Sequence, residues 1–221
     1  MFDLPVLGVI YFVCAVMFHF SATSYVYTTR RGKFQVWAEI LLRLRLRGDE
    51  QILDLGCSRG AVLLMAASLL PRGKAIGIDV WKTNERAIMQ RALRHAAQCR
   101  TEAVAERVEL QTADMRHLPF SHGLFDLVVS SMAIHNIQDP EGRKQAIIEA
   151  VRVLKPGGRL VIADFHETQR YGERLRELAM TDVTQQALGW LFWYGGPWAA
   201  PKLAYLICTF MISDIVQQQY C

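Results

Sequence analysis

Gln51-Ile-Leu-Asp-Leu-Gly-Cys-Ser-Arg-Gly60 predicts a short apolar strand, a tight glycine turn and, directly after it, the start of a helix. Such a unit forms a cradle for a polar cofactor, because backbone N–H groups at the turn and at the helix N-terminus point toward the ligand. A dinucleotide site requires the spacing G-x-G-x-x-G, whereas the glycines here are Gly56 and Gly60. No Lys-Ser/Thr pair follows the turn, so the pattern is not a phosphate-binding P-loop either.

The overall composition is that of one globular domain with modest extensions. The chain has 221 residues, of which 52% are hydrophobic, and a formal net charge of +4. This mild charge, without a basic run interleaved with aromatic residues, argues against a nucleic-acid partner. The five cysteines form no C-x-x-C pair and no metal-ligand grouping with the histidines. We therefore expect reduced thiols, a cytoplasmic setting and no metal site.

The N-terminal segment differs in composition from the rest of the chain. Leu4 to Thr29 contains no Asp, Glu, Lys or Arg, and Arg30, Arg31 and Lys33 follow at once. A membrane-spanning helix needs about 20 such residues, and a basic flank marks its cytoplasmic side. Residues 1–32 are therefore expected to form an apolar helix. It either anchors the chain at the cytoplasmic face of a membrane through residues 4–29 or packs as a lid over a pocket.

Residues 33–221 are expected to form the remaining domain, in which helices and strands alternate. The patterns predict helices at 33–46, 61–70, 84–99, 141–154 and 171–180, and strands at 52–55, 75–80, 108–112, 125–130, 159–164, 183–194 and 202–210. This alternation is typical of an α/β fold with a doubly wound parallel sheet covered by helices on both faces. The last two strands flank Gly195-Gly-Pro197, which suits an antiparallel edge.

Three acids stand at the ends of the first three predicted strands: Asp54, Asp79 and Asp114. In an open parallel sheet, ligands bind at the carboxyl ends of the strands. A carboxylate at Asp79 can accept both hydroxyls of a ribose, and Asp114 can accept the exocyclic amine of adenine. Met115 can pack on one face of the adenine ring and Trp81 on the other. The strand ends therefore predict a site for an adenosine-containing cofactor.

The motifs from about Gln51 to about Phe165 resemble, in their order, those of the class I S-adenosylmethionine-dependent methyltransferases. Phe125-Asp-Leu-Val-Val-Ser-Ser131 is similar to the family's fourth-strand motif. Arg152-Val-Leu-Lys-Pro-Gly-Gly-Arg-Leu-Val161 is similar to the start of its fifth strand in the ubiquinone/menaquinone group. The resemblance implies a seven-stranded sheet of order 3-2-1-4-5-7-6, with the last strand antiparallel. It also implies S-adenosyl-L-methionine as cofactor and S-adenosyl-L-homocysteine as product.

The resemblance and the strand-end positions together assign the cofactor-binding residues. They are Asp54, Gly56, Cys57, Ser58, Gly60, Asp79, Val80, Trp81, Ala113, Asp114, Met115 and Ser130. The chain departs from the family at Ser58, where a glycine is usual.

Residues that contact the methyl acceptor are expected after the fourth and fifth strands and in the late aromatic cluster. They are His135, Asn136, His166, Tyr171 and Trp193. His135 is the candidate catalytic base, which is needed only if the acceptor is protonated at the working pH. The alternative for His135 is a hydrogen-bonded residue at the start of a helix.

The function implied by the resemblance is in-line transfer of a methyl group to a small acceptor. We expect a lipophilic acceptor, because the N-terminal helix and the late aromatic residues would supply an apolar pocket. One alternative is an RNA or protein methyltransferase of the same fold, which would need a basic groove or an added recognition domain. Another is a non-catalytic cofactor-binding subunit held at a membrane. The acceptor atom and the oligomeric state stay open.

Overall fold

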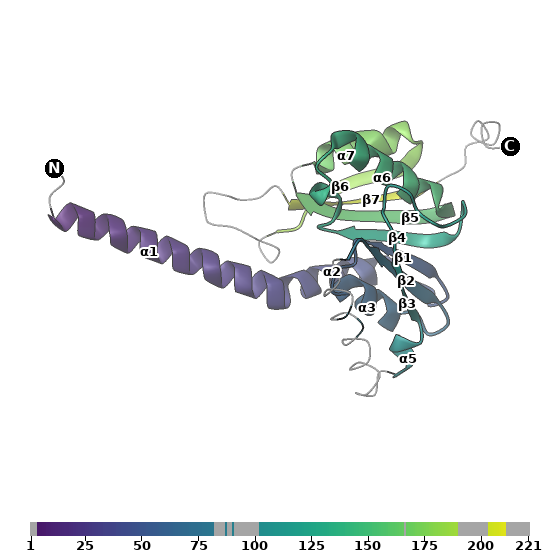
Figure 1. The fold of residues 1–221 in the computed structure, drawn as a ribbon, viewed down its shortest axis with the longest axis horizontal. Helices are drawn as coiled ribbons and strands as arrows, with labels where there is room; N and C mark the ends of the chain where they lie inside the picture. Colours follow the sequence, from purple (N-terminus) through teal and green to yellow (C-terminus); the bar gives the residue numbers. More distant parts are fainter. Residues whose placement is uncertain are drawn as a thin grey trace.

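The fold is a seven-stranded sheet with helices on both faces and a long N-terminal helix that projects from one side (Figure 1). The computed structural model describes residues 4–81, 87, 90, 102–165, 167–189 and 203–210. The strand order is β3-β2-β1-β4-β5-β7-β6, which confirms the predicted order.

Five parallel strands form the part of the sheet that carries the site. The seven strands of the whole sheet are β1 (Gln51–Leu55), β2 (Lys74–Asp79), β3 (Val108–Thr112), β4 (Phe125–Ser131), β5 (Leu154–Phe165), β6 (Met180–Ala187) and β7 (Leu203–Phe210), and the first five of them form the parallel set. β1 pairs in parallel with β2 and β4, β2 with β3, and β4 with β5. β7 runs antiparallel to β5 and to β6, as predicted, and β6 lies at the edge. The order reverses at β1 and β4, where an open sheet leaves a crevice for a ligand.

The helices cover the two faces of the sheet with two separate apolar cores. The helices are α1 (Leu4–Tyr27), the π-helix η1 (Thr28–Gly32), α2 (Lys33–Arg43), α3 (Ala61–Ser68), α5 (Glu102–Ala105), the 3₁₀ turn η3 (Ile134–Asn136), α6 (Pro140–Arg152) and α7 (Thr168–Glu177). One core joins α2 and α3 to the sheet through Trp37, Ile52 and Leu63. The other joins α6 and α7 to the opposite face through residues such as Leu53 and Leu175. Ile52 and Leu53 belong to different cores because successive strand residues point to opposite faces.

Several element boundaries differ from the predicted ones. The predicted helix 171–180 is α7, which ends at Glu177, and Met180 already belongs to β6. The helix stops because Ala179 adopts a left-handed backbone with φ +58°, which cannot continue a right-handed helix. β5 begins at Leu154, ahead of the predicted residue 159, because the segment after α6 already pairs with β4 at Phe125.

Two predicted elements lie wholly or partly outside the described residues. Of the predicted helix 84–99, only residues 87 and 90 are described. The predicted strand 183–194 corresponds to β6, which starts earlier, at Met180, and ends at Ala187. Residues 190–202, which include the predicted turn at Gly195, are also outside the described part of the chain.

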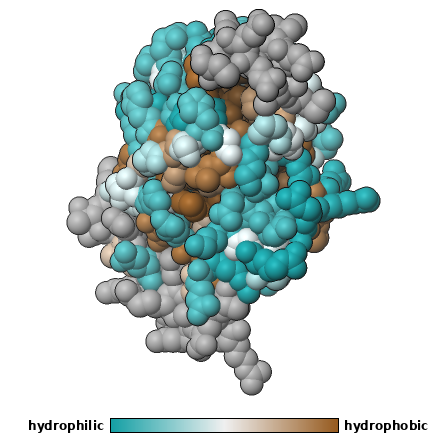
Figure 2. All heavy atoms as spheres, turned by 90° about the vertical axis from the view of Figure 1, so that its right-hand side faces the viewer, coloured by the Kyte–Doolittle hydropathy of each residue, from teal (hydrophilic) through white to brown (hydrophobic). Residues whose placement is uncertain are grey.

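The exposed surface of α1 contrasts with that of the domain. On the side of the domain opposite α1, hydrophilic side chains predominate and enclose a smaller hydrophobic area (Figure 2). α1 instead presents apolar side chains to its surroundings along its whole length, for example Val9, Phe12 and Phe18. It extends away from the domain and does not lie over the ends of the strands (Figure 1).

Candidate functional site

The candidate site is a pocket of about 810 Å³ at the carboxyl ends of β1, β2 and β4. It brings together residues from the glycine turn, from the end of β2, from the loop after β3 and from η3. Ten of the predicted site residues line it: Asp54, Gly56, Cys57, Ser58, Asp79, Val80, Ala113, Asp114, Met115 and Asn136. The parallel pairing explains this convergence, because strands that run the same way end at the same edge of the sheet.

The turn between β1 and α3 depends on backbone conformations that favour glycine. Gly56 has φ +70°, and a Cβ atom there would lie 2.3 Å from the Cβ of Ala133. Gly60 has φ +72° and is the N-cap of α3. Gly56 is therefore required both by its φ angle and by the close approach of the segment after β4.

Ser58 shares this left-handed conformation, with φ +45°, although it carries a side chain. The end of β2 holds it in place from two sides. The backbone N–H of Ser58 donates to Oδ2 of Asp79 at 2.8 Å. The indole Nε1 of Trp81 donates to the carbonyl oxygen of Ser58 at 3.1 Å. These two bonds offset the strain of a non-glycine residue, which explains how the turn tolerates serine where the family usually has glycine.

Asp54 is the most deeply buried acid of the pocket, with an exposed fraction of 1%. Burial raises its pKa to about 7. A hydrogen bond from the backbone N–H of Leu63, in the first turn of α3, lowers the pKa, and the nearby charge of Asp79 raises it. Its Oδ1 atom has no hydrogen-bond partner within the described part of the chain. A carboxylate oxygen in this state is an acceptor for a positively charged donor that enters the pocket.

Asp114 is engaged by a residue of its own loop. The guanidinium of Arg116 donates to both carboxylate oxygens, with Nε at 3.0 Å from each, and the backbone N–H of Arg116 donates to Oδ1 at 2.9 Å. The Arg116 side chain accordingly lowers the pKa of the Asp114 carboxyl. An adenine amine at Asp114 would therefore share the carboxylate with Arg116, or displace it.

His135, the candidate base, lies beside the pocket and pairs with a buried acid. Its Nδ1 atom forms a short hydrogen bond with Oδ1 of Asp164, and its backbone N–H donates to Oδ2 of the same residue at 3.0 Å. Asp164 is completely buried at the end of β5. A carboxylate at Nδ1 orients the imidazole and makes Nε2 the nitrogen that can take up a proton. Of its neighbours in the chain, Ala133 and Asn136 line the pocket.

Several predicted residues have other placements. Ser130 is buried, and its hydroxyl donates to the carbonyl of Leu55 at 3.2 Å instead of facing the pocket. Trp81 binds the glycine turn, as described above. Tyr171, a predicted acceptor contact, is a residue of α7 whose side chain is buried in the core, beside a second depression between α6 and α7. Its pKa is raised by burial and by Asp164. His166 and Trp193 are outside the described residues.

The structure also adds site residues that the sequence patterns did not predict. Lys33 and Trp37 of α2 line the pocket, and so does Ser131. The indole Nε1 of Trp37 donates to Oγ of Ser131 at 2.8 Å, which joins α2 to the end of β4. Asp164 could have been found from the sequence, because it ends its strand just as Asp54 and Asp79 end theirs.

The comparison with protein families gives the same fold and motif set. The family model described as "Methyltransferase domain" matches residues 53–162, from β1 to β5. This chain belongs to the class I S-adenosylmethionine-dependent methyltransferases. The chain is similar to the demethylmenaquinone methyltransferase of Lactiplantibacillus plantarum, with 32% identity over 132 residues, which are 59% of this chain and 52% of that one. It is also similar to the ubiquinone/menaquinone biosynthesis C-methyltransferase UbiE of Roseobacter denitrificans, with 29% identity over 62% of this chain and 51% of that one.

Solved structures share the fold of this chain at low identity. The Burkholderia thailandensis 1,6-didemethyltoxoflavin-N1-methyltransferase, solved with S-adenosylhomocysteine, has a TM-score of 0.62 at 18% identity and covers 91% of this chain and 89% of its own. The [4+2]-cyclase SpnF has a TM-score of 0.64, also at 18% identity, over 80% and 81%. The chain spans about half the length of the curated relatives it matches. One fold therefore carries different reactions, and the activity must be argued from the site.

The pocket fits the family's cofactor, S-adenosylmethionine. The unpartnered oxygen of Asp54 suits the cofactor's ammonium group. Asp79 ends β2, where a carboxylate can accept ribose hydroxyls, and Asp114 and Met115 follow β3 and line the same pocket, where they could contact an adenine. Burial raises the pKa of the Cys57 thiol, so this lining residue offers an apolar contact and not a nucleophile.

Proposed function

We propose that this methyltransferase transfers a methyl group from S-adenosylmethionine to a small, lipophilic, quinone-type acceptor. The observation that carries the proposal is the convergence of Asp54, Asp79 and Asp114 on one pocket, with a buried Asp54 oxygen that has no hydrogen-bond partner among the residues the structure describes. The quinone-type acceptor is proposed from the relatives, whose names specify demethylmenaquinone and ubiquinone/menaquinone biosynthesis.

The protein's part in this reaction is to bind, orient and exclude water. When bound, the cofactor supplies an electrophilic methyl group on a sulfonium. Asp54 would hold the ammonium group, Asp79 the ribose hydroxyls and Asp114 the adenine amine. Most of the rate enhancement in such a reaction comes from fixing the two partners in line, which removes translational and rotational freedom before the chemical step.

We further propose that His135 is the general base and Asp164 the residue that positions it. A quinol acceptor carries hydroxyl protons, so a base is required when the acceptor becomes nucleophilic. Nε2 of His135 would receive that proton. The buried carboxylate of Asp164, bound at Nδ1, stabilises the imidazolium that forms. Asn136, one residue further on and facing the pocket, would contact the acceptor.

Calorimetry and a turnover assay test the proposal directly. Full-length protein in mild detergent is titrated with S-adenosylmethionine and then assayed for methylation of a demethylated naphthoquinol. Asp79→Ala is expected to weaken cofactor binding at least tenfold. The substitution removes both the ribose contacts and the hydrogen bond that the backbone N–H of Ser58 donates to Asp79. Asp49→Ala, an exposed acid outside the pocket, is the matched control and should leave binding unchanged.

Two outcomes would contradict the proposal. If S-adenosylmethionine does not bind, and Asp79→Ala behaves like the unaltered protein, the cofactor assignment is wrong. If the cofactor binds tightly but no acceptor is methylated in a broad screen of quinols, phenols, amines and thiols, the chain is instead a non-catalytic cofactor-binding subunit.

A further inference from the structure

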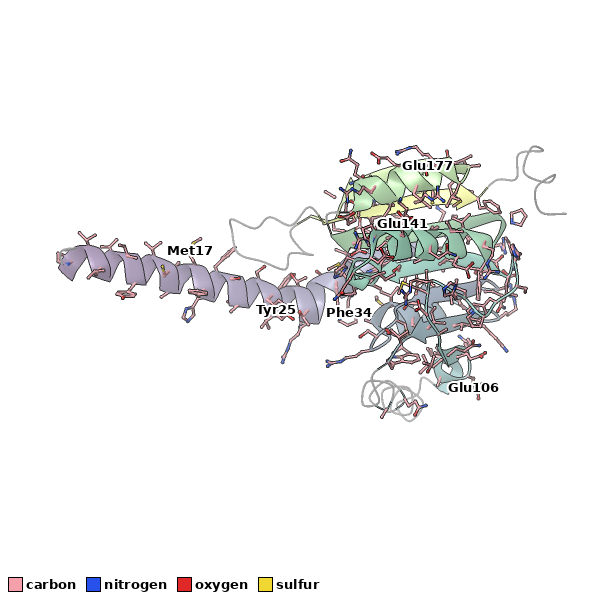
Figure 3. The ribbon with its side chains drawn as sticks, turned by 45° about the horizontal axis from the view of Figure 1, so that its top comes forward. Met17, Tyr25, Phe34, Glu106, Glu141 and Glu177 are labelled. Carbon is pink, nitrogen blue, oxygen red and sulfur yellow. The ribbon has the colours of Figure 1, made fainter. Side chains whose placement is uncertain are left out.

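One helical run connects the projecting N-terminus to the wall of the pocket. α1, η1 and α2 follow one another without a break, and the run Pro5–Arg43 is long and apolar enough to cross a membrane. Its first part is exposed on every side, whereas α2 is part of the domain core. Figure 3 shows Met17 and Tyr25 on the projecting part and Phe34 where the run meets the domain.

The dimensions of α1 match the apolar interior of a bilayer. At about 1.5 Å per residue, its 24 residues extend roughly 36 Å, compared with a hydrocarbon thickness of about 30 Å. None of its most apolar window is buried within the described structure. Side chains such as Phe18, which is 75% exposed, would be unfavourable in water, so this surface requires an apolar partner.

The end of α1 nearest the domain has the features of a membrane–water interface. Tyr25 and Tyr27 are exposed there, and aromatic side chains of this kind favour the headgroup level. The exposed Arg30 and Arg31 follow within one turn. Lys33 lies close enough to Arg59, in the glycine turn, for the two charges to interact. Arg30, Arg31, Lys33 and Arg59 together form a positive collar, which is complementary to anionic phospholipid headgroups.

The same collar forms the edge of the cofactor pocket. Lys33 and Arg59 both line the pocket, together with Trp37 one turn further along α2. Lys33 follows Tyr27 by only six positions, which corresponds to about 9 Å along a helix. A rigid helix of that length cannot hold the pocket far from the surface in which α1 is embedded.

We propose that the continuous helix holds the cofactor pocket at the headgroup level of an anionic phospholipid bilayer, so that the acceptor passes from the lipid directly into the pocket. This inference rests on the lipophilic acceptor proposed above, and it adds that the bilayer is the source of that acceptor. It predicts that the height of the pocket above the bilayer, set by residues 28–33, controls the reaction with membrane-dissolved acceptors.

A matched pair of insertions tests this placement in anionic vesicles. Seven helix-forming residues are inserted between Tyr27 and Thr28, which raises the domain by about 10 Å and keeps nearly the same helical phase. In the control, the same residues are inserted between Asp3 and Leu4, at the far end of α1. Methylation is measured with a naphthoquinol that carries a long isoprenoid tail and with one that has no tail.

The raised variant should methylate the tailed quinol at least tenfold more slowly and the tail-free quinol within twofold of the unaltered rate. The control insertion should change neither rate by more than twofold. Equal rates for both insertions would overturn the inference. So would full-length protein that fails to float with the vesicles, or that forms detergent-free oligomers through α1, since a second copy would then be the apolar partner.

Hydrogen exchange supplies a readout that needs no turnover, so failure of the proposed methylation is distinguishable from failure of this inference. Anionic vesicles should slow amide exchange at least threefold at 58–60 and 136–139, on the pocket rim, compared with detergent. Amide exchange at residues 121–124, which precede β4 at the amino ends of the strands and so lie away from the pocket, should not change. The raised variant should lose the protection. Unchanged exchange at the pocket rim of the unaltered protein would overturn the inference even if the protein methylates quinols.

Discussion

Replacing Asp54 by asparagine is expected to stabilise the protein without cofactor while weakening cofactor binding. The carboxyl is 1% exposed, and burial raises its pKa from 3.8 to about 7. Each unit of difference between the folded and unfolded pKa corresponds to about 1.4 kcal/mol. The ionised carboxylate therefore lowers the free energy of unfolding by up to about 4 kcal/mol above pH 7. Because the site relaxes and asparagine retains the hydrogen bond from Leu63, we expect a gain of about 2 kcal/mol for Asp54→Asn at pH 8.

The sign of the pH dependence follows from proton counting. Between pH 4 and 7 the folded protein binds more protons at Asp54 than the unfolded chain does, so the Asp54 contribution to stability falls as the pH rises. Below pH 4 the aspartic acid is neutral in both states and resembles asparagine. The difference between variant and unaltered protein should therefore be near zero at pH 4, grow through pH 6 and level off above pH 7.

Urea unfolding of the full chain in mild detergent, followed by tryptophan fluorescence at several pH values, measures this difference. Asp114→Asn is the matched control from the same pocket, because Arg116 lowers the pKa of Asp114. Its effect should have the opposite sign: a slight loss of stability at neutral pH that disappears as the pH falls through the folded pKa. An Asp54→Asn variant that is less stable at pH 8, or whose difference does not vary with pH, would refute the reasoning.

Cofactor binding should respond in the opposite direction. A hydrogen bond between charged groups is worth about 1.5 to 3 kcal/mol, so Asp54→Asn should weaken S-adenosylmethionine binding by roughly 10- to 100-fold above pH 7. Binding to the unaltered protein should tighten as the pH rises through 7, because the carboxylate must be ionised to attract the ammonium group. Calorimetry that shows equal affinities for both proteins would assign Asp54 a purely structural role at the start of α3.

Three further changes test other parts of the site. Asp164→Asn should lower kcat at least 100-fold and leave cofactor affinity within twofold, because the imidazole of His135 loses the carboxylate that orients it; an unchanged kcat in a folded variant would argue against the positioning role. Arg116→Gln should tighten cofactor binding about threefold by calorimetry, since the adenine amine no longer competes for Asp114, and weaker binding would indicate that Arg116 itself holds the cofactor. Ser58→Gly should raise the free energy of unfolding by about 0.5 to 1 kcal/mol, because relief of the left-handed backbone strain outweighs the extra conformational freedom of glycine in the unfolded chain. Urea unfolding that shows a loss of stability would mean that the serine side chain stabilises the turn.

The sequence predicted those features that depend on local pattern and on the sheet edge. The glycine spacing placed the turn and the apolar runs placed the strands along the chain, while the resemblance to the methyltransferase family supplied the strand order that the structure confirms. The sequence allowed us to predict that Asp54, Asp79 and Asp114 lie close together, because parallel strands end at the same edge of the sheet. Boundaries were less accurate where a single backbone angle decides them, as at Ala179, whose left-handed φ ends α7.

Other parts of the site could not be read from the chain, because they depend on contacts between distant segments. Trp37 reaches Ser131 across 94 positions, and helical periodicity shows only that Trp37 is on an apolar face. His135 lies in η3, after β4, and Asp164 lies near the end of β5; they meet because β4 and β5 are neighbours. The side chain of Tyr171 lies on the buried face of α7 because of the direction in which that helix packs, which hydropathy does not specify.

The amino-acid sequence by itself determined the alternation of strands and helices, the cofactor turn and an apolar N-terminal helix, since each follows from short-range propensity or from the period of the apolar residues. Only the tertiary structure decided that α1 extends from the domain and that its continuation, α2, forms a wall of the pocket. The physical reason is that an apolar helix gains equally from burial under a domain or in another apolar medium. The choice therefore depends on whether the folded domain offers a complementary face, which no local pattern records.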